Sequence, residues 1–115
     1  MIRGMIVAVM LVGLSSSADA MSLIFKNYKA AKNEDEKALM KLYLDGVREG
    51  VSIFDAELAV EGRQPLFCMP NNLALTVEQA EDIMMREAEK NTDPDNVPVS
   101  LLLVEGLKDT FPCQH

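Results

Sequence analysis

The sequence predicts an all-α domain, a compact bundle of four to five helices closed by one disulfide. Apolar residues recur every three or four positions in several segments, whereas no segment shows the period-two alternation that is typical of a β-strand. Two of the helical segments follow capping residues. Two cysteines, Cys68 and Cys113, stand in a chain that begins with the pattern of an export signal.

Residues 1–20 have the three parts of a secretory signal peptide. Arg3 supplies the positive charge, residues 5–14 form an apolar run, and Ala18-Asp19-Ala20 matches the small-x-small pattern of a cleavage site. The run is shorter than the roughly 20 apolar residues that span a bilayer, so we expect no membrane anchor after cleavage. A short buried N-terminal helix is the alternative. We predict a cleaved signal over 1–20, export to the periplasm, and a single domain over 21–115.

The chain is acidic, with a formal net charge of −7 at pH 7. Loss of residues 1–20 removes one basic and one acidic residue, so the exported domain keeps this charge. Nucleic acid phosphates and anionic lipid surfaces repel such a protein, which argues against nucleic-acid binding. A basic protein partner is attracted instead.

Two helices are expected in the first half of the domain. Residues 21–32 predict a short one. A long helix follows, with Asn33 as its cap, Glu36 completing a capping box, and Gly62 as its stop. Its buried stripe is expected to comprise Leu39, Tyr43, Val47, Val51, Phe54 and Leu58.

Two glycines, Gly46 and Gly50, lie one turn apart inside this long helix. Each costs up to about 1 kcal/mol relative to alanine. A helix that keeps both indicates close approach of another backbone, and simple tolerance of the two residues is the alternative.

Two further helices follow a loop over residues 62–75. Thr76 and Gln79 form a second capping box, and the helix that they begin is expected to end near Lys90. Its buried side is expected to comprise Val77, Ala80, Ile83, Met84 and Ala88. A polar turn over residues 91–97 leads to Pro98, which fits the first position of a last, broadly apolar helix.

The two cysteines are expected to form a disulfide, because an even number of cysteines in an exported chain favours pairing. The chain-entropy model gives about 4 kcal/mol for a loop of the length that Cys68 and Cys113 would close. Two free buried thiols are the alternative.

Residues that could carry catalysis are scarce. Nucleophilic catalysis needs a positioned base, and the only histidine, His115, is the last residue. Asp93-x-Asp95-Asn96 is similar to the start of a calcium loop, but Pro98 stands where that loop requires glycine. Neighbouring carboxylates such as Asp45 and Glu49 are expected to form a solvated face. We predict no enzyme activity, no cofactor and no metal.

A domain without a catalytic constellation is better suited to binding than to catalysis. The best candidate surface is the acidic side of the helix over residues 77–90, together with the turn that follows it. Ordinary helix solubility is the alternative interpretation of these charges. The expected partner-contacting residues are Glu78, Glu81, Asp82, Met85, Glu89, Asn91, Asp93, Asp95 and Asn96.

Several short motifs stand in a fixed order over about residues 39–113. The most specific are Phe67-Cys68-x-Pro70 and the terminal Phe111-Pro112-Cys113, and the others are Tyr43-Leu44-x-Gly46-Val47-x-x-Gly50, Leu75-Thr76-x-x-Gln79, Pro94, Val97-Pro98 and Leu107. In this combination the chain resembles the Rap/Tai family of type VI secretion immunity proteins. Many relatives carry further cysteines in the N-terminal part, and here there are none.

The resemblance implies a small helical periplasmic protein that binds and inhibits a peptidoglycan-cleaving amidase effector with a papain-like cysteine site. It also implies a homodimer that holds the effector with one helix and blocks it with a protruding loop, and it matches Cys68 and Cys113 to the family's motifs. The alternative function is a periplasmic chaperone of the acid-activated HdeA type, because protonation of the many carboxylates would remove the net charge of −7.

Overall fold

The structure is a computed structural model that describes residues 22–71 and 73–114. The predicted signal peptide over residues 1–20 and the terminal His115 lie outside the described residues. Within them the chain forms four helices: α1 (Phe25–Lys29), α2 (Glu34–Val60), α3 (Val77–Glu89) and α4 (Val99–Thr110). The only β-type pairing in this part of the chain is an isolated bridge between Ile24 and Pro98. The all-α prediction is confirmed.

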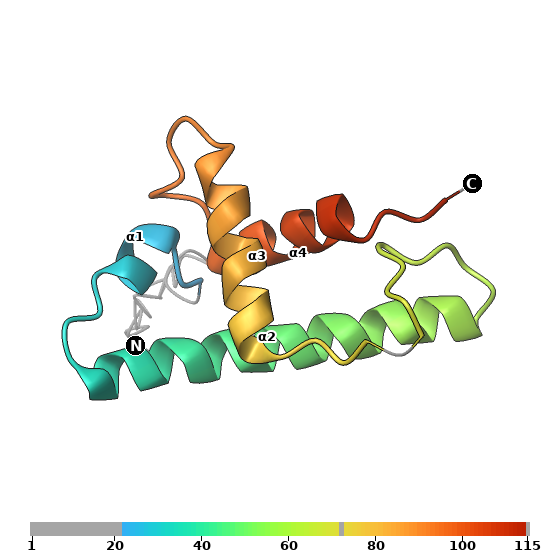
Figure 1. Ribbon diagram of the computed structural model, residues 1–115, viewed down its shortest axis with the longest axis horizontal. Coiled ribbons are helices and arrows are strands. Elements are labelled where there is room, and N and C mark those ends of the chain that lie inside the picture. Colours follow the sequence, from blue (N-terminus) through green and yellow to red (C-terminus); the bar gives the residue numbers. More distant parts are fainter. Residues whose placement is uncertain (1–21, 72, 115) are drawn as a thin grey trace, which may run out of the picture.

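The helices pack around a core built mainly by α3 and α4. Figure 1 shows α2 as a long helix along one side of the molecule, with α3 crossing it and α4 beyond α3. The α2 helix contributes one fully buried apolar side chain, Leu44. The largest other fully buried side chains are Met84, Val99, Leu102, Leu103 and Leu107. Since α4 supplies four of these five, the broadly apolar last helix that the sequence predicts forms much of the core.

The ends of α2 lie close to where the sequence places them. The Asn33 side chain accepts a hydrogen bond from the Glu36 N–H at 2.8 Å, which caps the helix. The Glu36 carboxylate accepts from the Lys32 N–H at 2.7 Å, one residue before the expected partner of a capping box. At the other end Gly62 has a φ of 73°, a conformation that favours glycine. Local chemistry therefore determines both ends of α2.

The first and last helices are shorter than the sequence predicts. Residues 23–25 pair with the segment before α4: the Val99 N–H donates to the Leu23 carbonyl at 2.8 Å, and the Phe25 N–H donates to the Val97 carbonyl at 3.0 Å. Because the backbone groups of these residues make their hydrogen bonds to the segment before α4, they do not join a longer helix, and α1 begins at Phe25. Pro98 has an extended conformation and precedes α4 as its cap residue.

The prediction of which α2 residues face the protein core is partly wrong. Leu39 and Phe54 are 60% and 58% exposed, whereas Leu44, outside the stripe, is completely buried. The helix carries apolar residues on two sides, and packing of α3 and α4 selects the side that contains Leu44. Periodicity alone does not distinguish two such sides.

The loop between α2 and α3 is attached at several points. Cys68 and Cys113 form the predicted disulfide, with their Cα atoms 4.9 Å apart. The Cys68 N–H also donates to the Phe111 carbonyl at 2.8 Å. The buried Asp55 carboxylate accepts from the Leu66 N–H at 2.5 Å, which ties the loop to α2. These contacts hold the loop against the carboxyl end of α4.

Candidate partner-binding surface

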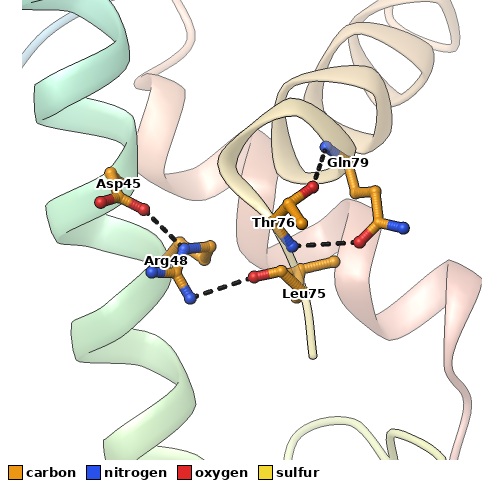
Figure 2. A network of polar contacts seen from close by, with 5 residues as sticks. All are labelled: Asp45, Arg48, Leu75, Thr76 and Gln79. Atoms are coloured by element: carbon orange, nitrogen blue, oxygen red, sulfur yellow. Dashed lines mark hydrogen bonds and ion pairs between the residues drawn. The ribbon is translucent and has the colours of Figure 1, made fainter. Parts of the chain in front are cut away.

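The orientation of α3 is set at its first turn. Thr76 and Gln79 form the predicted capping box, with reciprocal bonds of 3.0 and 3.2 Å between backbone N–H groups and side chains. The residue before the cap, Leu75, accepts a hydrogen bond through its carbonyl from the Arg48 guanidinium at 3.1 Å. Arg48 in turn donates to Asp45 at 2.7 Å, so a polar network joins the middle of α2 to the start of α3 (Figure 2).

The outer side of α3 carries most of the predicted acidic surface. Glu78, Asp82 and Glu89 are exposed, and none makes an ion pair with another described residue. Met85 lies among them and is 39% exposed. The buried side consists of Ala80, Ile83, Met84 and Ala88, four of the five residues that the sequence predicts, and the fifth, Val77, is half-buried. Uncompensated charge beside exposed apolar surface is suited to contact with a partner.

Glu81 lies differently from its acidic neighbours. It is half-buried, and its carboxylate accepts a hydrogen bond from the Tyr28 hydroxyl of α1. Burial of Tyr28, reinforced by the bond to Glu81 and by the negative charge of that carboxylate, raises the pKa of the hydroxyl above its ordinary value of 10.0. Glu81 therefore joins α1 to α3, and the surface open to a partner is formed by its neighbours.

We expect the shifted Tyr28 pKa to make the folded state sensitive to alkali. The unfolded chain loses the Tyr28 proton near pH 10, whereas the folded chain keeps it. The contribution of Tyr28 to the free energy of unfolding is therefore fully present below pH 10 and decreases as the pH rises further. The slope is up to about 1.4 kcal/mol per pH unit. Chemical denaturation between pH 8 and pH 11 measures it, in wild type, Y28F and the matched variant Y43F. Equal slopes in Y28F and Y43F would contradict the expectation.

A groove runs along α3 between the acidic side chains and the end of α4. Its volume is about 510 Å³. Three predicted contact residues line it, namely Asp82, Met85 and Glu89. The other wall comes from distant parts of the chain, the loop at Leu73 and Leu75 and the end of α4 at Phe111. We call this hollow the acidic groove.

Sequence reasoning missed two contributors to the acidic groove. Phe111 fits the apolar stripe of α4 and reads as a core residue, but it is only half-buried and lines the groove. Arg86 also lines it and makes no ion pair among the described residues. The spacing of Arg86 could have identified it, because it lies one helical turn from both Asp82 and Glu89.

The turn over residues 91–97 is held against α1. Asp95 forms an ion pair with Lys29 at 2.9 Å, and its carbonyl accepts from the Lys26 N–H at 2.9 Å. The turn's other predicted contact residues, Asn91, Asp93 and Asn96, are exposed. The turn thus continues the surface at the carboxyl end of α3, and Asp95 positions it.

The two glycines of α2 are exposed. A Cβ built at Gly46 or Gly50 meets no heavy atom within 4 Å. The close approach that their spacing predicts therefore does not occur among the described residues. Exposed apolar side chains lie on the same helix, namely Leu39, Leu42, Ile53, Phe54 and Val60.

The described residues contain no group of three or more His, Cys, Asp or Glu side chains placed to hold a metal ion. Both cysteines are in the disulfide and supply no thiol. No helix in residues 22–71 and 73–114 is long and apolar enough to cross a membrane.

One known protein family matches most of the chain. The model of the Rap1a immunity proteins matches residues 14–113, which includes all four helices and both cysteines. Comparison with curated proteins and with solved structures found no match. Of the functions that the sequence leaves open, the match supports an immunity protein that binds a cognate type VI effector, a class that is generally not enzymatic. The chain belongs to the Rap1a immunity protein family.

Proposed function

We propose that this immunity protein binds a peptidoglycan amidase effector of type VI secretion in the periplasm and inhibits it by covering its active site. The family match supports the class of function, and the acidic groove supports the choice of surface. Three exposed carboxylates that make no ion pair among the described residues, at Glu78, Asp82 and Glu89, are available to basic residues around an active-site cleft. The net charge of −7 would speed encounter with such a cleft.

The shape of the surface supports inhibition by steric occlusion. The acidic groove accepts a protruding apolar side chain of the effector between Met85 and Phe111. The turn over residues 91–97 follows the end of α3, where Glu89 lines the groove. Its contacts with α1 reduce the entropy that would be lost when a free loop is ordered on binding.

We also propose that the protein is a homodimer and that α2 joins the two copies. Leu42, Gly46, Gly50 and Phe54 follow one another at four-residue intervals, so the pattern reads apolar, glycine, glycine, apolar in both directions. An antiparallel pair of α2 helices about a two-fold axis would place Gly46 of one copy against Gly50 of the other. Small residues at the crossing let two helix backbones approach closely. This face lies away from the core side of α2, which contains Leu44.

The inhibition test uses the protein purified from the periplasm and the amidase encoded beside its gene. We expect loss of peptidoglycan hydrolysis at one protein chain per amidase, and light scattering should give the mass of two chains alone and of a two-to-two complex with the enzyme. Replacing two groove charges in D82K/E89K should weaken binding about tenfold, because each rim charge contributes up to about 1 kcal/mol.

The control variant E61K/E105K makes the same change in net charge away from the acidic groove. It should bind the amidase as wild type does. Full amidase activity in an excess of wild-type protein would rule out the proposed function. A monomeric mass would rule out only the dimer and would leave the inhibitory function standing.

A further inference from the structure

A second groove lies on the opposite side of Met85. It is formed between α1, α2 and α3 and has a volume of about 430 Å³. Its apolar lining includes Ala31, Met40 and Met85, and the hydroxyl of Tyr28 lies within it, bonded to Glu81. Met85 lines both grooves, so the two form one continuous surface across α3.

The second groove differs from the first in charge. Lys29, Lys37 and Lys41 line it, which is three of the seven lysines of a chain with a net charge of −7. Lys29 forms an ion pair with Asp95, and the Lys37 Nζ atom lies 3.8 Å from the Glu34 Oε1 atom. Lys41, by contrast, makes no ion pair among the described residues. The single carboxylate in the lining, Glu81, already accepts the Tyr28 hydrogen bond. We call this hollow the lysine groove.

We propose that the lysine groove binds an acidic residue and an adjacent apolar side chain of the effector, while basic residues of the same effector face the acidic groove. This inference rests on the proposed function and adds the charge pattern of the partner. Like charge across an interface is strongly unfavourable, so a uniformly basic effector surface would be repelled by Lys41. Met40 and Met85 have flexible, polarizable side chains that adapt to the shape of an inserted apolar group.

The two-sign surface also orients the partner. A single acidic patch attracts a basic cleft in many orientations, whereas adjacent patches of opposite sign favour one. Met85 at the boundary supplies apolar contact that both halves of the partner share. The active site of the effector would thus be covered in a fixed register.

The test compares amidase binding by wild type, K41E, D82K and K108E at low and high salt, about 0.05 and 0.5 M. Lys108 is an exposed lysine of α4 that lines neither groove, so K108E is the matched control. We expect K41E to weaken binding about tenfold at low salt, mostly through slower association, and less at high salt. K108E should remain within about twofold of wild type.

The outcomes separate the two proposals. If D82K weakens binding and K41E behaves as K108E does, the effector contacts the acidic groove alone, and the lysine groove inference is wrong while the proposed function stands. Tighter binding by K41E would show a basic partner segment there and would equally overturn the inference. If wild type does not bind the amidase, both proposals fall. Thermal unfolding of K41E should match wild type, because Lys41 is exposed.

Discussion

Replacing both cysteines with alanine is expected to lower the free energy of unfolding by about 4 kcal/mol. The bridge joins residues 45 apart, so its loss frees a long loop in the unfolded chain and raises that chain's entropy. The folded state gains no compensating contact, because Cys68 and Cys113 lie at or near the surface. A domain of this size is stable by about 5–15 kcal/mol, so the loss is a large part of the total.

Urea unfolding of wild type and C68A/C113A measures this difference directly. Wild type in a reducing agent should lose a similar amount, which separates loss of the bond from effects of the alanines. A difference below about 1 kcal/mol would contradict the expectation. The variant should also bind the effector less well, because the disulfide and the bond from Cys68 to Phe111 hold one wall of the acidic groove.

Replacing Gly106 with alanine is expected to destabilise the fold by about 2 kcal/mol. Gly106 lies where α4 packs on α3. A Cβ there would stand 2.7 Å from the Ile83 Cγ2 atom and 3.0 Å from the Ile83 carbonyl oxygen. The first contact requires the Ile83 side chain to shift and the second requires the α3 backbone to move slightly, and this combined cost exceeds the gain of up to about 1 kcal/mol in helix propensity.

A matched control is available in the same chain. In dilute samples, where the chain is monomeric, the variants G46A and G50A add the same methyl group with no neighbouring atom within 4 Å, so each should stabilise the fold by about 0.5–1 kcal/mol, although both should weaken the proposed dimer. The double variant G106A/I83L should recover part of the loss, because leucine has no methyl branch at Cβ while the carbonyl contact remains. Stabilisation by G106A, measured by thermal unfolding, would show that α3 and α4 separate freely at this point.

Much of the fold follows from local patterns in the sequence. The cap at Asn33, the capping box of Thr76 and Gln79, and the end of α2 near Gly62 each depend on a few adjacent residues. The buried side of α3 was also largely predictable, because its apolar residues other than Met85 lie on one side. The number of helices and the disulfide follow from composition and spacing over the whole domain.

The binding surface was predictable only in part. The exposed acidic residues of α3 are recognisable because charged and apolar positions alternate with the helical period. The grooves are not, since each combines segments from distant parts of the chain, such as Phe111 with Leu73 or Tyr28 with Met40. Glu81 illustrates the difference: its position on α3 is that of a solvated residue, and its contact with Tyr28 spans 53 positions.

By itself the sequence determined which segments are helices, where α2 and α3 begin and end, and which two cysteines pair, because these depend on backbone hydrogen bonds, caps and the count of thiols. Only the tertiary structure decided which side of α2 is buried, that within one chain Gly106 and not Gly46 is the site of close helix contact, and where the two grooves of opposite charge lie. The physical reason is that a helix with apolar residues on two sides has no local preference between them. Packing against α3 and α4 makes that choice, and the surfaces left open follow from it.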